Sequence, residues 1–280
     1  MPATAFRAVE TTGYRREKWV ELKPNIPSVA VQAAYLKKLT KLIEEMDDSV
    51  RYWIERTYKA HEPVTLAMDD AIPASELQKV IRELTKRWLK KWNDAAPELA
   101  KYFALAVKDR TDANLKTILR EANWTVRFTM TPGMRDTLKA TLQQNVELIK
   151  SIPQQYLKNV QGDVMRSIQA GRDMGPLAKA LQKNYGVTKR RAALIARTQN
   201  NMATGAMDRA RKLEMGLTKS KWRHSRAGKE PRPTHLANDG KLYDTARGWY
   251  DPDPKVRRHI FPGELINCRC SSITVVPGFS

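Results

Sequence analysis

Apolar residues recur every three or four positions over most of residues 31–215, the spacing of one face of an α-helix. The first such stripe comprises Leu36, Leu39, Ile43, Met46, Val50 and Trp53. A second stripe comprises Leu77, Ile81, Leu84, Trp88 and Trp92. Lysine and glutamate fill the positions between the apolar residues. The same spacing occurs in coiled coils, but each run is short, so the pattern favours a helical bundle.

Proline and glycine interrupt the stripes, and they predict where the helices begin and end. We expect a loop at residues 61–73, a helix that Pro97 opens and another that ends at Pro153. A further helix is expected to stop near Gly186, and the next continues to about residue 215. No alternation typical of a β-strand occurs before residue 216.

The composition changes after residue 216. Glycine, proline and aspartate become more frequent, and strand-like runs, the second rich in valine and threonine, occur at residues 219–223 and 272–276. The sequence therefore predicts a mainly α protein with a multi-helix N-terminal region and a small α+β C-terminal domain. The expected parts are an extended arm (1–30), a helical region (31–152), a second helical segment (153–215) and the α+β unit (216–280).

Charge points to a polyanionic partner. The chain has 50 lysines and arginines against 30 acidic residues, a formal net charge of +20. Such a field attracts nucleic acid, and no recognition-helix motif predicts base reading. The candidate DNA contacts lie on the last long helical run: Lys189, Arg190, Arg191, Arg197, Arg209, Arg211 and Lys212. The alternative is a solvated face that docks on an acidic protein surface.

No run approaches the roughly 18 apolar residues that a membrane span needs. The charged first 20 residues leave no room for the apolar core of a signal peptide, so we expect synthesis in a cytoplasm and no membrane contact. The two cysteines, Cys268 and Cys270, provide no disulfide framework.

Reactive side chains gather near the C-terminus, where both cysteines and three of four histidines occur within residues 224–270. His235, His259, Cys268 and Cys270 are types that zinc accepts. A metal nuclease would instead use His235, Asp239 and Asn267. The favoured interpretation is structural and involves no reaction. In it, the side chains of His235 and Asp239 form a hydrogen bond and fix the turn at Gly240. We therefore assign no catalytic residue and no cofactor, and we leave zinc open.

A set of short motifs accompanies these residues. It comprises Arg232, His235, Asp239, Gly240, Pro262, Gly263, Asn267, Cys268, Arg269 and Cys270, preceded by Ala196-Arg197-Thr198-Gln199. From about residue 155 to 277 the chain resembles the Mu F-like minor head (head-morphogenesis) proteins of tailed phages. Two departures are Gln199, where an acidic residue is expected, and the insertion-like segment 248–254. The first argues against a catalytic role for that helix position.

The resemblance implies a binding protein, not an enzyme. It would lie inside the virion head near the portal, after assembly in the host cytoplasm, and some members are thought to leave with the DNA. The implied partners are the portal protein, major capsid or scaffold proteins, and packaged double-stranded DNA without sequence preference. The alternative is a metal-dependent, nuclease-like enzyme built on the C-terminal His/Asp/Cys cluster.

Overall fold

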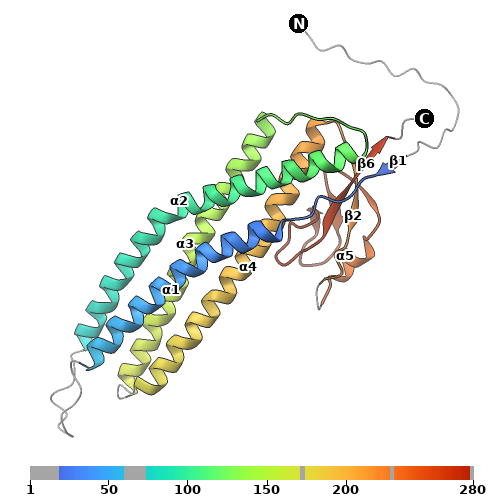
Figure 1. Ribbon diagram of the computed structural model, residues 1–280. Helices are drawn as coiled ribbons and strands as arrows, with labels where there is room; N and C mark the ends of the chain where they lie inside the picture. Colours follow the sequence, from blue (N-terminus) through green and yellow to red (C-terminus); the bar gives the residue numbers. More distant parts are fainter. Residues whose placement is uncertain (1–18, 60–73, 171–173, 228–229, 278–280) are drawn as a thin grey trace, which may run out of the picture.

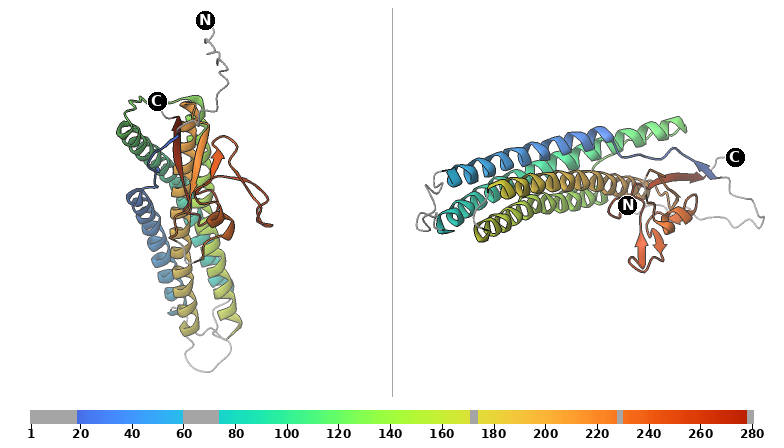
Figure 2. Two further views of the ribbon diagram at one scale, coloured as in Figure 1. Left: turned by 90° about the vertical axis from the view of Figure 1, so that its right-hand side faces the viewer. Right: turned by 90° about the horizontal axis from the view of Figure 1, so that it is seen from below.

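The computed structural model describes residues 19–59, 74–170, 174–227 and 230–277. Four long helices lie side by side within these ranges and run alternately up and down (Figure 1). They are α1 (Val29–Lys59), α2 (Ala74–Glu121), α3 (Pro132–Gln169) and α4 (Met174–Glu214). A small sheet lies at one end of this elongated bundle (Figure 2). The predicted fold class, mainly α with a small α+β part, is confirmed.

The predicted apolar stripes form the bundle core. Leu39, Ile43 and Met46 of α1 are fully buried, and Trp88 and Trp92 of α2 pack in the same cluster. Trp53 departs from the prediction, because 38% of its surface is exposed. None of the described helices combines the length and the apolar character needed to cross a membrane.

Three predicted helix boundaries are wrong. Pro97 lies inside α2, Pro153 lies inside α3, and Gly186 lies inside α4. A proline in a helix interior removes one backbone hydrogen bond and costs about 3 kcal/mol, and a glycine costs about 1 kcal/mol. Around Pro153, the burial of Ile152 and Tyr156 in the bundle core opposes this cost. The predicted loop at 61–73 and residues 1–18 of the predicted arm lie outside the described residues.

The sheet contains β1 (Trp19–Glu21), β2 (Lys219–Arg223), β3 (Leu242–Asp244) and β6 (Ser271–Pro277). All pairs are antiparallel, in the order β1-β6-β2-β3. The two predicted strand runs correspond to β2 and β6. The prediction of no strand before residue 216 is wrong, since β1 pairs Trp19 with Pro277. Three residues are too few to show alternation.

Two further elements complete the C-terminal part. Helix α5 (Pro233–Ala237) follows β2, and β4 (Trp249–Asp251) pairs with β5 (Arg258–Ile260) as a separate hairpin. A small apolar cluster of Trp222, Tyr243, Ile260, Cys268 and Cys270 lies between these elements. The C-terminal part therefore has a core of its own, but a small one.

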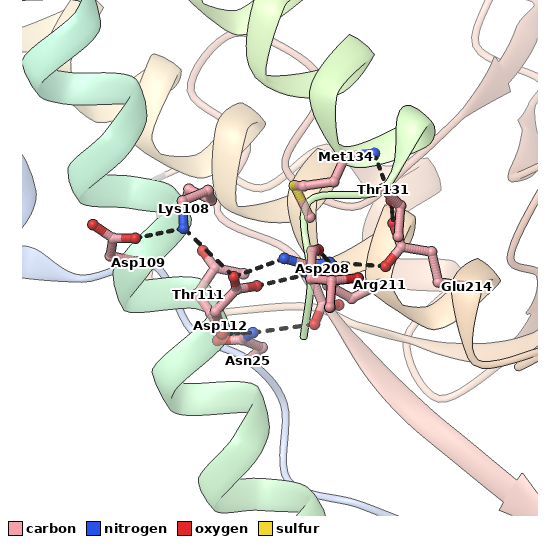
Figure 3. Close-up of polar contacts among 11 residues, drawn as sticks. Asn25, Lys108, Asp109, Thr111, Asp112, Thr131, Met134, Asp208, Arg211 and Glu214 are labelled. Atoms are coloured by element: carbon pink, nitrogen blue, oxygen red, sulfur yellow. Dashed lines mark hydrogen bonds and ion pairs between the residues drawn. The ribbon is translucent and has the colours of Figure 1, made fainter. Parts of the chain in front are cut away.

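Buried ion pairs hold the C-terminal end of α4 in the bundle, and a hydrogen bond from one of them continues to the sheet. Arg211 of α4, only 2% exposed, donates from Nε and Nη2 to both carboxylate oxygens of Asp112 in α2, each at 2.8 Å (Figure 3). The next residue, Lys212, lies 2.6 Å from Asp208 and donates to Ser272 of β6 at 2.9 Å. Asn25 in turn donates to Asp208 at 3.1 Å. We call this group of five charged and polar contacts the α4 ionic joint.

The α4 ionic joint corrects the list of DNA contacts. Arg211 and Lys212 were predicted to contact DNA, and this is wrong, because both side chains are buried and paired within the chain. Basic side chains on helices are usually exposed, so the sequence alone favoured the opposite placement.

Removing Arg211 tests the importance of this joint. Arg211→Ala should lower the free energy of unfolding by about 3 kcal/mol, because it removes both hydrogen bonds to the buried Asp112 carboxylate and leaves it only Lys108, 3.7 Å away. Arg190→Ala removes an exposed arginine from the same helix and should change stability by no more than about 0.5 kcal/mol. Urea unfolding followed by circular dichroism measures both. Equal effects of the two substitutions would contradict the role of the joint.

Candidate functional site

His235, Cys268 and Cys270 meet in the small C-terminal core. His235 lies on α5, and both cysteines lie in the segment that leads into β6. The Nδ1 atom of His235 is 3.5 Å from Sγ of Cys268 and 3.6 Å from Sγ of Cys270. The exposed fractions of these residues are 2%, 3% and 6%, respectively. Two sulfurs and one imidazole nitrogen therefore converge in a nearly closed site.

The far side of the imidazole faces a carboxylate. Nε2 of His235 lies 3.3 Å from Oδ2 of Asp251 in β4, and the Asp251 side chain is fully buried. The Trp222 ring stands edge-on to the imidazole, with ring centroids 5.1 Å apart. The two ring nitrogens therefore face different groups: Nε2 faces the Asp251 carboxylate, and Nδ1 faces the two sulfurs.

The two thiols influence each other's titration. A hydrogen bond from Cys270, helped by His235, lowers the pKa of Cys268. The same hydrogen bond, together with burial, raises the pKa of Cys270 above its usual range. The contacts therefore favour the thiolate at Cys268, which is the form that binds metals and attacks electrophiles.

The predicted zinc set included His259, and this residue does not join the cluster. The three residues that converge are His235, Cys268 and Cys270. His259 lies in β5, where its ring packs against Tyr250 at a centroid distance of 5.4 Å. Among the residues that the structure describes, no other group of His, Cys, Asp or Glu side chains is arranged to hold a metal.

The expected bond between His235 and Asp239 is absent from the described contacts. Asp239 instead accepts from the backbone N–H of His224 at 2.9 Å and from Arg226 at 3.3 Å. The His224 bond, aided by Arg226, lowers the pKa of Asp239. Gly240 follows with a φ of +77°, as the predicted turn requires. Asp239 thus shapes the turn, and Asp251 is the acid that faces His235.

The other motif residues hold the cysteine segment in place. Asn201 of α4 donates to the carbonyl of Cys268 at 2.8 Å, and Arg197 donates to Oδ1 of Asn267 at 2.6 Å. Gly263 follows Pro262 and has a φ of +84°; a Cβ there would lie 3.1 Å from the carbonyl oxygen of Asn201. Only glycine permits this approach without strain, so the Pro-Gly turn brings its segment directly against α4.

Two arginines of the motif serve the same purpose. Arg232 donates to the carbonyl of Ile266 at 2.9 Å, and Arg269 donates to the carbonyl of Ala227 at 2.8 Å. Gln199 lies away from this site, where its Oε1 accepts from Asn145 of α3 at 3.0 Å. The buried Gln199 therefore contributes to the bundle core.

The remaining candidate DNA contacts on α4 also make contacts within the chain. Lys189 pairs with Glu44 at 3.2 Å, and Arg191 donates to Ser151 at 2.8 Å. The Arg209 guanidinium lies 3.6 Å from the centroid of the Phe261 ring, and burial lowers its pKa. Arg190 is exposed. DNA contact by these residues and by Arg197 stays a prediction.

Comparisons with known proteins identify part of the chain. Residues 158–273 match the family model described as "Phage Mu protein F like protein". The chain is 27% identical over 264 residues to an "Uncharacterized protein" of Haemophilus influenzae (strain ATCC 51907 / DSM 11121 / KW20 / Rd). That alignment covers 91% of this chain and 56% of the relative, so the chain spans little more than half of the relative's length. No solved structure matches.

Proposed function

We propose that this chain, whose residues 158–273 match the phage Mu protein F-like family, acts in phage head morphogenesis as a minor head protein. The family match carries the proposal. It includes all of α4 and the whole His235–Cys268–Cys270 site, which are the parts that the motif residues hold together. The burial of that site supports a binding role over a catalytic one.

Partner docking belongs to the helical bundle in this proposal. Residues 19–157 lie outside the family match, and they form most of the bundle. Tyr52 and Trp53 are exposed near the end of α1 farthest from the sheet, with their rings 5.4 Å apart (Figure 1). Aromatic side chains are enriched in protein interfaces. The portal protein, or a capsid or scaffold protein, is the partner that we assign to this end, inside the head.

Complementation tests the head role. Disrupting the gene in the phage that encodes the chain should sharply reduce the yield of DNA-filled heads, and the full chain should restore it. The double variant Tyr52→Glu/Trp53→Glu should enter heads about tenfold less, the effect of losing about 1.4 kcal/mol of binding. Tyr102→Glu, at an exposed tyrosine of α2, is the control and should enter normally. A normal yield of filled heads without the gene would refute the proposal.

Contact with packaged DNA is the second part of the proposal. Because Arg211 and Lys212 are buried, we add to the remaining α4 residues the exposed cations around the β4–β5 hairpin: Arg247, Lys255 and Arg257. None of these three side chains forms an ion pair with any residue that the structure describes. Unpaired exposed cations bind phosphate through counterion release, without reading sequence.

Filter binding with duplex DNA of mixed sequence tests this contact. The affinity should fall as salt rises, with a log–log slope of about −0.9 for each phosphate contacted. The triple variant Arg247→Ala/Lys255→Ala/Arg257→Ala should weaken binding and flatten that slope.

The control removes the same charge from another surface. Lys79→Ala/Arg82→Ala/Lys86→Ala takes three exposed cations from α2 and should change the slope less. Equal effects of the two triple variants would mean that DNA affinity depends on the net charge of the chain and not on the β4–β5 hairpin. No binding at low salt would exclude DNA contact by the chain alone.

A further inference from the structure

We propose that His235, Cys268 and Cys270 bind a zinc ion that holds the cysteine segment against α5 and the sheet. The proposal goes beyond the head-assembly role and does not depend on it. The converging donors are the soft thiolates and imidazole that zinc prefers in proteins.

The spacing of the donors fits a tetrahedral ion. Zinc binds sulfur at about 2.3 Å and nitrogen at about 2.0–2.1 Å, so tetrahedral angles place these two donors about 3.5 Å apart. The distances from Nδ1 of His235 to the two sulfurs are 3.5 and 3.6 Å. All three donor atoms lie within 4.8 Å of one another. The site therefore needs no large rearrangement to accept the ion.

The surroundings of His235 also suit a ligand. Histidines that bind metals through one ring nitrogen generally direct the other at a carboxylate or carbonyl, which orients the ring and raises its basicity. Asp251 occupies this position, 3.3 Å from Nε2. Oδ1 of Asp251 accepts from the backbone N–H of Asp253 at 3.0 Å, which leaves Oδ2 of Asp251 directed at His235. The negative charge of Asp251 also favours a cation on the opposite side of the ring.

The fourth coordination position faces a small cavity. This cavity has a volume of about 50 Å³ and is lined by the three donors together with His224, Glu230 and Arg232, among others. A water molecule needs roughly 10–15 Å³ of such space, so water or a side chain from the lining can complete the tetrahedron. Pockets for small-molecule ligands are typically about 300–1,000 Å³. The small volume favours a structural ion over a catalytic one.

The size of the C-terminal part explains why an ion is useful there. Its apolar cluster contains five buried residues, two of which are the cysteines themselves. Small units with little apolar core commonly use a metal for stability. A zinc ion would link α5 to the segment before β6, which otherwise depends on single hydrogen bonds from Asn201, Arg232 and Arg269.

Metal analysis of the full chain, purified without a histidine tag, tests the inference. Elemental mass spectrometry should find about one zinc per chain, and removal of the metal by a chelator should lower the melting temperature. Cys268→Ser and Cys270→Ser should each lose the metal. His259→Ala is the matched control and should retain it, because His259 lies outside the cluster.

Cobalt substitution keeps the test decisive if the cysteine variants fail to fold. The wild-type chain, freed of metal and titrated with Co²⁺, should develop the visible absorption of a tetrahedral site with thiolate ligands. A wild-type chain that contains no zinc and binds neither added Zn²⁺ nor added Co²⁺ would overturn the inference. So would a metal-free chain of unchanged melting temperature whose Cys268 is rapidly alkylated, because that result assigns the cluster to a reactive thiol.

Discussion

The paired charges of Arg211 with Asp112 and of Lys212 with Asp208 anchor the end of α4 from which the chain continues into the sheet. They lie at the C-terminal end of α4, the helix that packs in the bundle and then leads into β2. Burying such charges is costly, and the geometry recovers that cost through two parallel hydrogen bonds from Arg211 to one carboxylate. Few other arrangements would satisfy these groups. The joint therefore holds the C-terminal end of α4 in place, and Lys212 extends it to Ser272 of β6. Asn201 and Arg197 of the same helix reach the cysteine segment.

The long elements could be predicted from the sequence because their apolar period repeats over many turns, as in the buried stripe around Ile43. Local signals were less reliable. Pro153 suggests a helix end, yet tertiary packing around it outweighs the local cost. Strand β1 has only three residues and owes its conformation to β6, far away in the sequence. The charge of Lys212 suggested exposure, because a sequence does not show that Asp208 and Ser272 will enclose it.

The candidate site was predicted in its residue types and only partly in its arrangement. The close spacing of Cys268 and Cys270 indicated that two sulfurs could converge, and His235 joins them. Asp251 was missed, since it lies in a segment that looked like an insertion, and its role depends on the pairing of β4 with β5. His259 was included for its type alone. Contacts between residues far apart in the sequence leave no regular spacing from which they could be predicted.

The proposal that the chain is a minor component of phage heads, with a helical bundle for docking, rests on the family match of residues 158–273. Quantitative mass spectrometry of purified procapsids and DNA-filled virions from the encoding phage tests this role most directly. We expect peptides of this chain at a few copies per particle in both. Absence from every particle would contradict it, and the buried His235–Cys268–Cys270 site would then need an explanation outside the virion.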